Sequence, residues 1–183
     1  MIFQFLNGSS PDSQGRYLSD ILGYSNKELE YGHDYIQVLF PLYEESKFNL
    51  EAPILNDLEV SFIKSDIEAL KGLNSAATRM LKFYRTSKHW ATPMNHNLLR
   101  ITRILKSTSI LLCRERSIEL HKKILNRCYE LYFYPAETTL DFWEYATEGK
   151  DPPNKKVMNY FDKIRTESPD ELWWQNIKVN VGD

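Results

Sequence analysis

The sequence predicts an all-α fold, an irregular bundle of about six to eight helices in a single domain. Apolar residues recur at i, i+3 and i+4 along most of the chain, and no segment shows the strict alternation of a half-buried strand. The 183 residues are 42% hydrophobic, which is enough for one domain with its own core. We expect residues 1–150 to form this domain, and residues 151–183 to form a linker and a short C-terminal helix packed on it or extending from it.

Turn-forming and capping residues divide the first half of the chain. The helix before Pro41 can be capped by Ser25 or Asn26, and it ends there because the residue before proline avoids the helical region. Asn56 is the expected N-cap of a later helix, with Glu59 at the capping-box position. After a short apolar piece and a polar loop in residues 1–14, we expect helices at about residues 18–22, 25–40, 56–72 and 74–84.

The second half contains the clearest helix of the chain. In the first half, Gly72 is expected to end the helix at residues 56–72. Residues 95–112 then form a helix that is apolar nearly all round, which is typical of a central, buried position. Its expected solvent face consists of Thr102, Lys106 and Ser109. Further helices are expected at about residues 115–132 and 138–145, and the capping pattern Ser168-Pro169-Asp170-Glu171 predicts a short terminal one.

The composition excludes several classes of function. A general polyanion binder usually has a basic excess, whereas this chain has 23 basic and 25 acidic side chains, so nucleic acid is not an expected partner. No apolar run approaches the ~20 residues of a membrane span, and Met1–Asn7 lack the basic start of a signal peptide. The two cysteines of the chain, Cys113 and Cys128, are expected to be reduced thiols. We therefore expect a soluble, cytoplasmic protein.

A narrow polar stripe runs along the helix at residues 95–112. When successive residues are placed about 100° apart, the stripe consists of His96, Arg100, Arg103 and Ser107. Leucine and isoleucine flank it on both sides, so two arginines lie inside an apolar coat. Because a buried charge is costly unless it is paired and hydrogen-bonded, other groups must satisfy these arginines.

The helix that ends before Pro41 offers partners for the two arginines. One side of that helix consists of Glu30, His33, Asp34 and Gln37. The simplest arrangement pairs Asp34 or Glu30 with either arginine of the stripe. The hydrogen-bonded network would be completed by His33, Gln37 and His96.

Two interpretations of this network remain open. In the first it is structural and fixes how two central helices cross. In the second it lines a pocket in which the arginines bind a carboxylate or phosphate, since a planar guanidinium can bind such groups bidentately. The candidate ligand-binding residues are Arg16, which follows a loop and could reach the same site, His33, Gln37, His96, Asn97, Arg100 and Arg103. The candidate structural ion-pair partners are Glu30 and Asp34.

Three segments carry a family resemblance. They are Gly15–Leu22 (GRYLSDIL), His33–Pro41 (HDYIQVLFP) and His96–Ser107 (HNLLRITRILKS). In this order they resemble the conserved region of the opioid growth factor receptor family, and the chain is similar to its short, bacterial members. The resemblance implies peptide binding, or opioid growth factor receptor activity. Animal members of the family are described as nuclear-associated receptors for the opioid pentapeptide Met-enkephalin.

The resemblance and the polar stripe together favour non-catalytic binding of a peptide, a protein or a small anion, without a cofactor or a metal. The alternative is an enzyme that acts on RNA or another phosphate-bearing substrate through histidine and arginine. Arg116 and His121 have the Arg-x4-His spacing of some all-helical ribonucleases, although such a spacing also arises by chance. None of the four histidines belongs to a zinc-protease pair. The ligand and the oligomeric state remain open.

Overall fold

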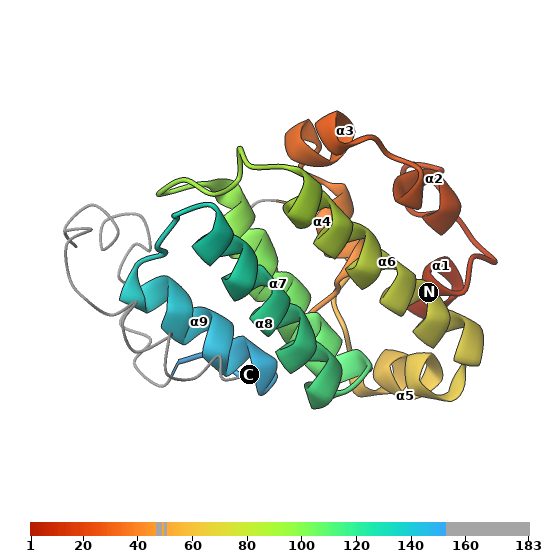
Figure 1. Cartoon of the computed structure of the whole chain (residues 1–183). Helices are drawn as coiled ribbons and strands as arrows, with labels where there is room; N and C mark the ends of the chain where they lie inside the picture. Colours follow the sequence, from red (N-terminus) through yellow and green to blue (C-terminus); the bar gives the residue numbers. More distant parts are fainter. Residues whose placement is uncertain (47–48, 50, 153–183) are drawn as a thin grey trace.

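The computed structural model describes residues 1–46, 49 and 51–152, and within these residues the chain is built from helices without a β-sheet (Figure 1). The all-α fold is therefore confirmed. The helices are α1 (Ile2–Leu6), α2 (Leu18–Leu22), α3 (Asn26–Tyr31), α4 (Tyr35–Leu39), α5 (Asp57–Ser65), α6 (Ile67–Thr86), α7 (His96–Leu111), α8 (Arg114–Glu130) and α9 (Glu137–Thr147). None of these helices combines the length and the apolarity needed to cross a membrane. The predicted terminal helix near Ser168 lies outside the described residues.

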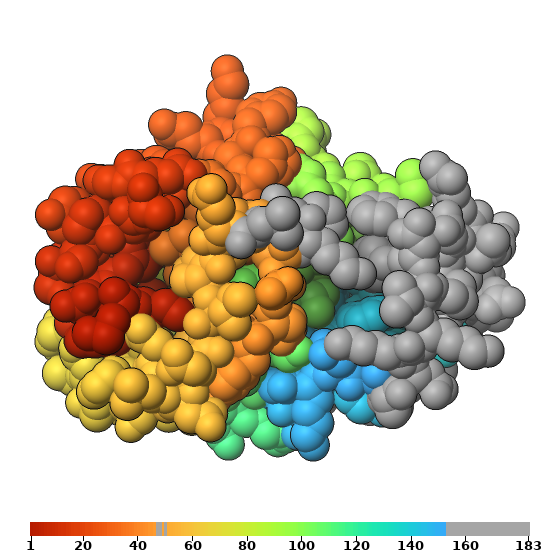
Figure 2. Space-filling model, turned by 180° about the vertical axis from the view of Figure 1, so that it is seen from behind, coloured from red at the N-terminus to blue at the C-terminus, as the bar shows by residue number. Residues whose placement is uncertain are grey.

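Helix α7 is the centre of the bundle, as predicted, because it packs against α8 and α9 and also touches α5 and α6. In Figure 1, α6, α8 and α9 run side by side, with α7 behind α8. The opposite view shows the segment between α4 and α5 on the far side of the bundle (Figure 2). Its residues Pro41 and Glu44 accept hydrogen bonds from Ser107 and Lys106 of α7. Lys106 of α7 does not face solvent as expected. Only 6% of its surface is exposed, since Glu44 and Asp151 bind its ammonium group at 2.7 and 2.9 Å.

The helix expected over residues 25–40 consists of two helices, α3 and α4, that are separated at Gly32. Gly32 has an extended conformation (φ −73°, ψ 135°), and glycine is costly inside a helix because it loses much conformational freedom there. Ser25 caps α3 as predicted, since its hydroxyl accepts the N–H of Glu28 at 3.2 Å. The break leaves the last carbonyl groups of α3 without helical donors, so they need other partners.

Gly72, expected to end a helix, lies instead inside α6. The boundary with α5 is at Asp66, whose carboxylate accepts the N–H groups of Glu68 and Ala69 and so starts α6. At Gly72, α1 comes so close to α6 that a Cβ atom would lie 1.9 Å from the carbonyl oxygen of Leu6. The glycine thus permits close packing between two helices.

Helix α1 was not predicted, and a long-range contact holds its N-terminus. Asn56 caps α5 as expected, with its side chain accepting the N–H of Glu59 at 2.9 Å. The carboxylate of Glu59 does not turn back to its own helix. It accepts the N–H groups of Ile2 and Phe3 at 3.2 and 3.3 Å, at the end of α1 where a negative charge is favourable. A helix of five residues is marginal without such tertiary support.

Candidate functional site

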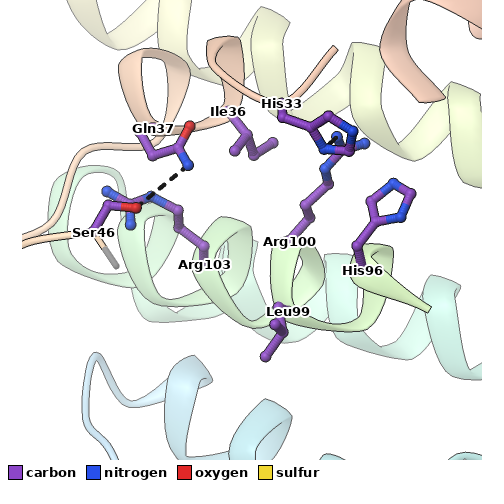
Figure 3. A pocket seen from close by; sticks show the side chains of 8 residues that line it. All are labelled: His33, Ile36, Gln37, Ser46, His96, Leu99, Arg100 and Arg103. Atoms are coloured by element: carbon purple, nitrogen blue, oxygen red, sulfur yellow. Dashed lines mark hydrogen bonds between the residues drawn. The ribbon is translucent and has the colours of Figure 1, made fainter. Parts of the chain in front are cut away.

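A cavity of about 400 Å³ between α4 and α7 brings together five of the seven candidate ligand-binding residues (Figure 3). They are His33, Gln37, His96, Arg100 and Arg103, and the lining is completed by Ile36, Ser46 and Leu99. The other two candidates, Arg16 and Asn97, do not line it. The polar stripe of α7 therefore faces the start of α4 across a hollow.

Arg100 is held by backbone carbonyl groups at the break between α3 and α4. Its Nη1 donates to the carbonyl oxygen of Leu29 at 2.7 Å and to that of Glu30 at 3.5 Å, and its Nη2 donates to the carbonyl oxygen of Gly32. The guanidinium carbon lies 5.5 Å from the centre of the Tyr35 ring, within the range of a cation–π contact. Arg100 is 5% exposed, and it caps the C-terminal end of α3, where a cation is favourable.

The two acidic residues expected to pair with Arg100 or Arg103 contact other groups. Asp34 pairs with Arg16 at 2.8 Å, and Arg16 also pairs with Asp12 at 2.6 Å. Glu30 accepts a hydrogen bond from the side-chain amide of Asn97 at 3.1 Å. Arg100 and Arg103 donate instead to backbone carbonyl oxygens at the ends of α3 and α4. Arg16 and Asn97 are thereby held away from the cavity, in contacts that serve the fold.

Only some of the hydrogen-bond donors of Arg103 have partners. Its Nε donates to the carbonyl oxygen of Phe40 at 2.8 Å, at the end of α4. Its Nη2 is buried and has no hydrogen-bond partner among the described residues. Burial lowers the pKa of Arg103 to about 10, against the opposing effect of the Glu44 carboxylate, so the group remains a cation at neutral pH. A buried donor without an acceptor costs about 1–3 kcal/mol, which a bound anion would offset.

His33 and His96 stand at the open side of the cavity. Their rings meet edge to face with 5.2 Å between the centroids, and His33 is exposed while His96 is partly buried. Burial and the nearby charge of Arg100 lower the pKa of His96 below 6.5, although Glu30 acts in the opposite direction. The His96 ring is therefore mainly neutral at pH 7, and its Nε2 lies 3.2 Å from the carbonyl oxygen of Glu30.

Gln37 and Ser46 lie at the other end of the cavity, beside Arg103 (Figure 3). The side-chain amide of Gln37 can be placed in two orientations. In the one drawn in Figure 3, its nitrogen lies 3.4 Å from Ser46 Oγ. In the other, which satisfies both ends of the amide, the nitrogen donates to the carbonyl oxygens of His33 and Asp34 at 3.1 and 3.2 Å. Ser46 belongs to the irregular segment after α4. No periodic pattern in the sequence indicated it.

The cavity is cationic on its polar side and apolar elsewhere. Both guanidinium groups reach it, and none of the residues that line it is acidic. Ile36 and Leu99 contribute aliphatic surface to the same space. In the part of the chain that the structure describes, no three histidine, cysteine or acidic side chains are grouped to hold a metal ion. This chemistry suits an anionic group attached to an apolar body.

Arg116 and His121, the two residues of the ribonuclease alternative, contact different groups from one another. Arg116 pairs with Glu119 at 2.6 Å and donates to Thr78 Oγ1 at 3.0 Å. The ring of His121 packs against Trp143 with 6.2 Å between the centroids, and burial lowers its pKa to about 4. A general base works best with a pKa near the operating pH, so this environment does not favour catalysis by His121.

Comparison with known proteins finds that the sequence of the chain is similar to one family. Residues 17–91 match the family model described as "Opioid growth factor receptor (OGFr) conserved region". The mouse and rat proteins called opioid growth factor receptor-like protein 1 are each 28% identical to this chain in an alignment that is 181 positions long and covers 87% of the chain. The protein of that name from Xenopus tropicalis is 28% identical in an alignment of 167 positions that covers 81% of the chain.

The similarity covers only part of those relatives. The chain spans 39% of the mouse protein, 38% of the rat protein and 32% of the Xenopus tropicalis protein. No solved structure matches the chain. The matched range of the family model contains His33 and α4, which line one side of the cavity, and it ends before α7, which lines the other.

Proposed function

This chain belongs to the family of the opioid growth factor receptor conserved region, and we propose that it is a non-catalytic binding domain whose α4–α7 cavity receives an anionic group of a peptide, a protein or a small ligand. Arg103 is the observation that carries this proposal. It is a cation at neutral pH, its buried Nη2 has no partner among the described residues, and the cavity lining contains no acidic side chain. An anionic oxygen that reaches Nη2 supplies the missing acceptor in a charge-assisted hydrogen bond.

The remaining lining residues suit a ligand whose charge sits next to an aliphatic body. Ser46 and Gln37 offer polar groups beside Arg103, and Ile36 and Leu99 offer apolar surface. Arg100 already donates to carbonyl groups, so it contributes positive charge to the cavity more than free donors. A carboxylate attached to an aliphatic group fits this division between one charged end and one apolar wall.

The free end of a peptide is one source of such an anion. A C-terminal carboxylate carries a full negative charge beside a side chain, which matches the arrangement of Arg103 against Ile36 and Leu99. The relatives carry a receptor-like name. The family resemblance given above implies Met-enkephalin as a ligand of animal members, so this pentapeptide is an appropriate probe. An amide in place of its C-terminal carboxylate removes the charge with little change in shape.

Calorimetric titration of the chain tests the proposal with matched ligands. The probes are N-acetyl-leucine and its amide, Met-enkephalin and its C-terminal amide, and inorganic phosphate. We expect at least one of the two carboxylate probes to bind, and its amide counterpart to bind weaker by about tenfold or more, because the charge-assisted hydrogen bond is lost. Failure of all anionic probes to bind, or equal binding of carboxylate and amide, contradicts the proposal.

Two variants locate the binding in the cavity. Arg103→Met keeps much of the side-chain volume and removes the guanidinium, and it should weaken anion binding by about tenfold or more. Arg114→Met is the matched control, because Arg114 is an exposed arginine of α8 that pairs with Glu148 outside the cavity. Its binding should equal that of the unmodified chain. If Arg103→Met also binds unchanged, the anion does not occupy this cavity.

A further inference from the structure

A second hollow of about 390 Å³ lies between α6 and α8, and we call it the α6–α8 groove. Its lining consists of Thr78, Leu81, Lys82, Arg85 and Thr86 from α6 and Arg116 and Lys123 from α8. Four of these residues are cationic and none is acidic, although the whole chain has a net charge of −2. In Figure 1 the two helices run side by side on the face turned toward the viewer, with α4 and α7 behind them. The groove is thus separate from the α4–α7 cavity.

The two cations that α6 contributes to the groove, Lys82 and Arg85, have no acidic neighbour on their own helix. The positions three and four residues away from Lys82 are Thr78, Arg79, Arg85 and Thr86. Within α6, those around Arg85 are Leu81 and Lys82. Like charges at this spacing destabilise a helix. The C-terminal end of α6 offsets part of this cost, because the helix dipole favours cations there.

Helix α8 adds two cations to the groove, and the helix dipole does not favour the first of them. Arg116 lies in the first turn of α8, at the positively polarised end. It is fixed in place by Asn74 at 2.9 Å, Thr78 at 3.0 Å and Glu119 at 2.6 Å. The same Glu119 carboxylate also pairs with Lys123, so one negative charge is shared by two cations. An excess of positive charge therefore remains in the groove.

We propose that the α6–α8 groove binds a small ligand that carries two or more phosphate groups. A phosphate monoester has a charge of about −1.5 to −2 and three strong acceptor oxygens, so two such groups balance the excess charge and accept from several donors at once. The groove supplies the types of side chain that bind phosphate: arginine as a planar fork, lysine as a point charge, and the hydroxyl group of Thr78. Its volume is that of a small-molecule site.

Titration of the full chain with tripolyphosphate at low ionic strength tests this site. Substitution of both Lys82→Ala and Arg85→Ala should weaken binding by about tenfold or more. Lys122→Ala is the matched control, since Lys122 is an exposed lysine of α8 that does not line the groove, and its binding should be unchanged. Arg103→Met should also bind tripolyphosphate normally, which separates this site from the α4–α7 cavity.

A further variant should strengthen binding, which a purely structural charge cluster does not explain. Glu119→Gln removes the carboxylate that Arg116 and Lys123 share, so we expect tighter binding of tripolyphosphate by about threefold or more. Equal binding by the unmodified chain and the double α6 variant would overturn the proposal, as would an equal loss in Lys122→Ala. Tighter binding of a single-stranded RNA than of tripolyphosphate, if it depends on Lys82 and Arg85, would also overturn it, because the groove would then serve a polymer.

Discussion

Arg100 and Arg103 lie about one turn apart on α7 and line the same cavity, but their guanidinium groups have different surroundings. Arg100 donates to carbonyl groups at the end of α3 and lies against the Tyr35 ring. Arg103 donates through Nε to the carbonyl of Phe40, and its Nη2 is buried without a partner in the described part of the chain. The difference arises because the helix break exposes several carbonyl oxygens next to Arg100, whereas Arg103 meets the end of α4.

The comparison shows that a buried arginine is not by itself evidence of a ligand site. What matters is how many of its donors the protein has already satisfied. By this criterion the Arg100 end of the cavity is part of the fold, and the Arg103 end retains a donor for a ligand. We propose that the two interpretations that the sequence leaves open apply to different residues of one stripe. The predictions that follow test this division, beginning with the largest expected effect.

Arg100→Ala is expected to lower the free energy of unfolding by about 3–5 kcal/mol. The substitution leaves the carbonyl groups of Leu29 and Gly32 without this donor, and it empties buried space beside Tyr35. Urea unfolding followed by circular dichroism measures the change. The control Arg114→Ala removes an exposed arginine and should cost about 0.5 kcal/mol or less. A loss below about 1 kcal/mol for Arg100→Ala would falsify the structural role of Arg100.

The pH dependence of stability extends the comparison to histidine. The folded pKa of His121 is lowered from 6.5 to about 4 by burial, so the unfolded chain binds the proton first as the pH falls. Stability contributed by the neutral ring is therefore complete above pH 6.5 and is lost between about pH 6.5 and 4. The total loss is about 3 kcal/mol. His96, whose pKa is also lowered, acts in the same direction.

The variant His121→Leu isolates the contribution of this residue. Its side chain cannot be protonated, so urea unfolding at pH 7 and pH 4.5 should show a smaller difference than in the unmodified chain. The exposed His89→Leu variant is the control and should retain the full pH dependence. An unmodified chain that is equally stable at both pH values would contradict the expected role of His121.

Arg103→Met is expected to change the free energy of unfolding by less than about 1 kcal/mol in either direction. A well-packed apolar side chain of similar volume removes the cost of burying the unpaired Nη2, which offsets the lost bond to Phe40. The same variant should lose anion binding, so the substitution should affect binding without a comparable effect on stability. If its stability falls as far as that of Arg100→Ala, the two arginines do not differ in the way described.

The smallest effect is expected for Asp34→Asn. Asp34 is partly exposed where it pairs with Arg16, an ion pair of this kind contributes about 0.5 kcal/mol, and Arg16 keeps its second partner, Asp12. Urea unfolding of this variant also tests the alternative in which Asp34 neutralises Arg100. In that case the loss would approach the several kcal/mol of a broken buried ion pair.

Helical periodicity was sufficient to predict the all-α fold and the polar stripe of α7. Apolar residues spaced three and four positions apart identify which face of a helix is buried, so the stripe and the central position of α7 followed from the residues. The capping roles of Ser25 and Asn56 were also readable, because a cap acts within one turn of its own helix. Five of the candidate residues indeed line one cavity.

The partners of these residues depended on contacts between distant segments. Gly72 reads as a helix breaker in the sequence, and only the crossing of α1 over α6 shows that its missing Cβ makes room for Leu6. The carbonyl groups that satisfy Arg100 belong to the backbone, which every residue carries, so no side-chain pattern marks them. The sequence by itself determined that the arginines of α7 would lie among apolar residues, although it placed the buried Lys106 on the solvent face. The tertiary structure decided which of their donors remain free, because that depends on where the backbone of another helix ends.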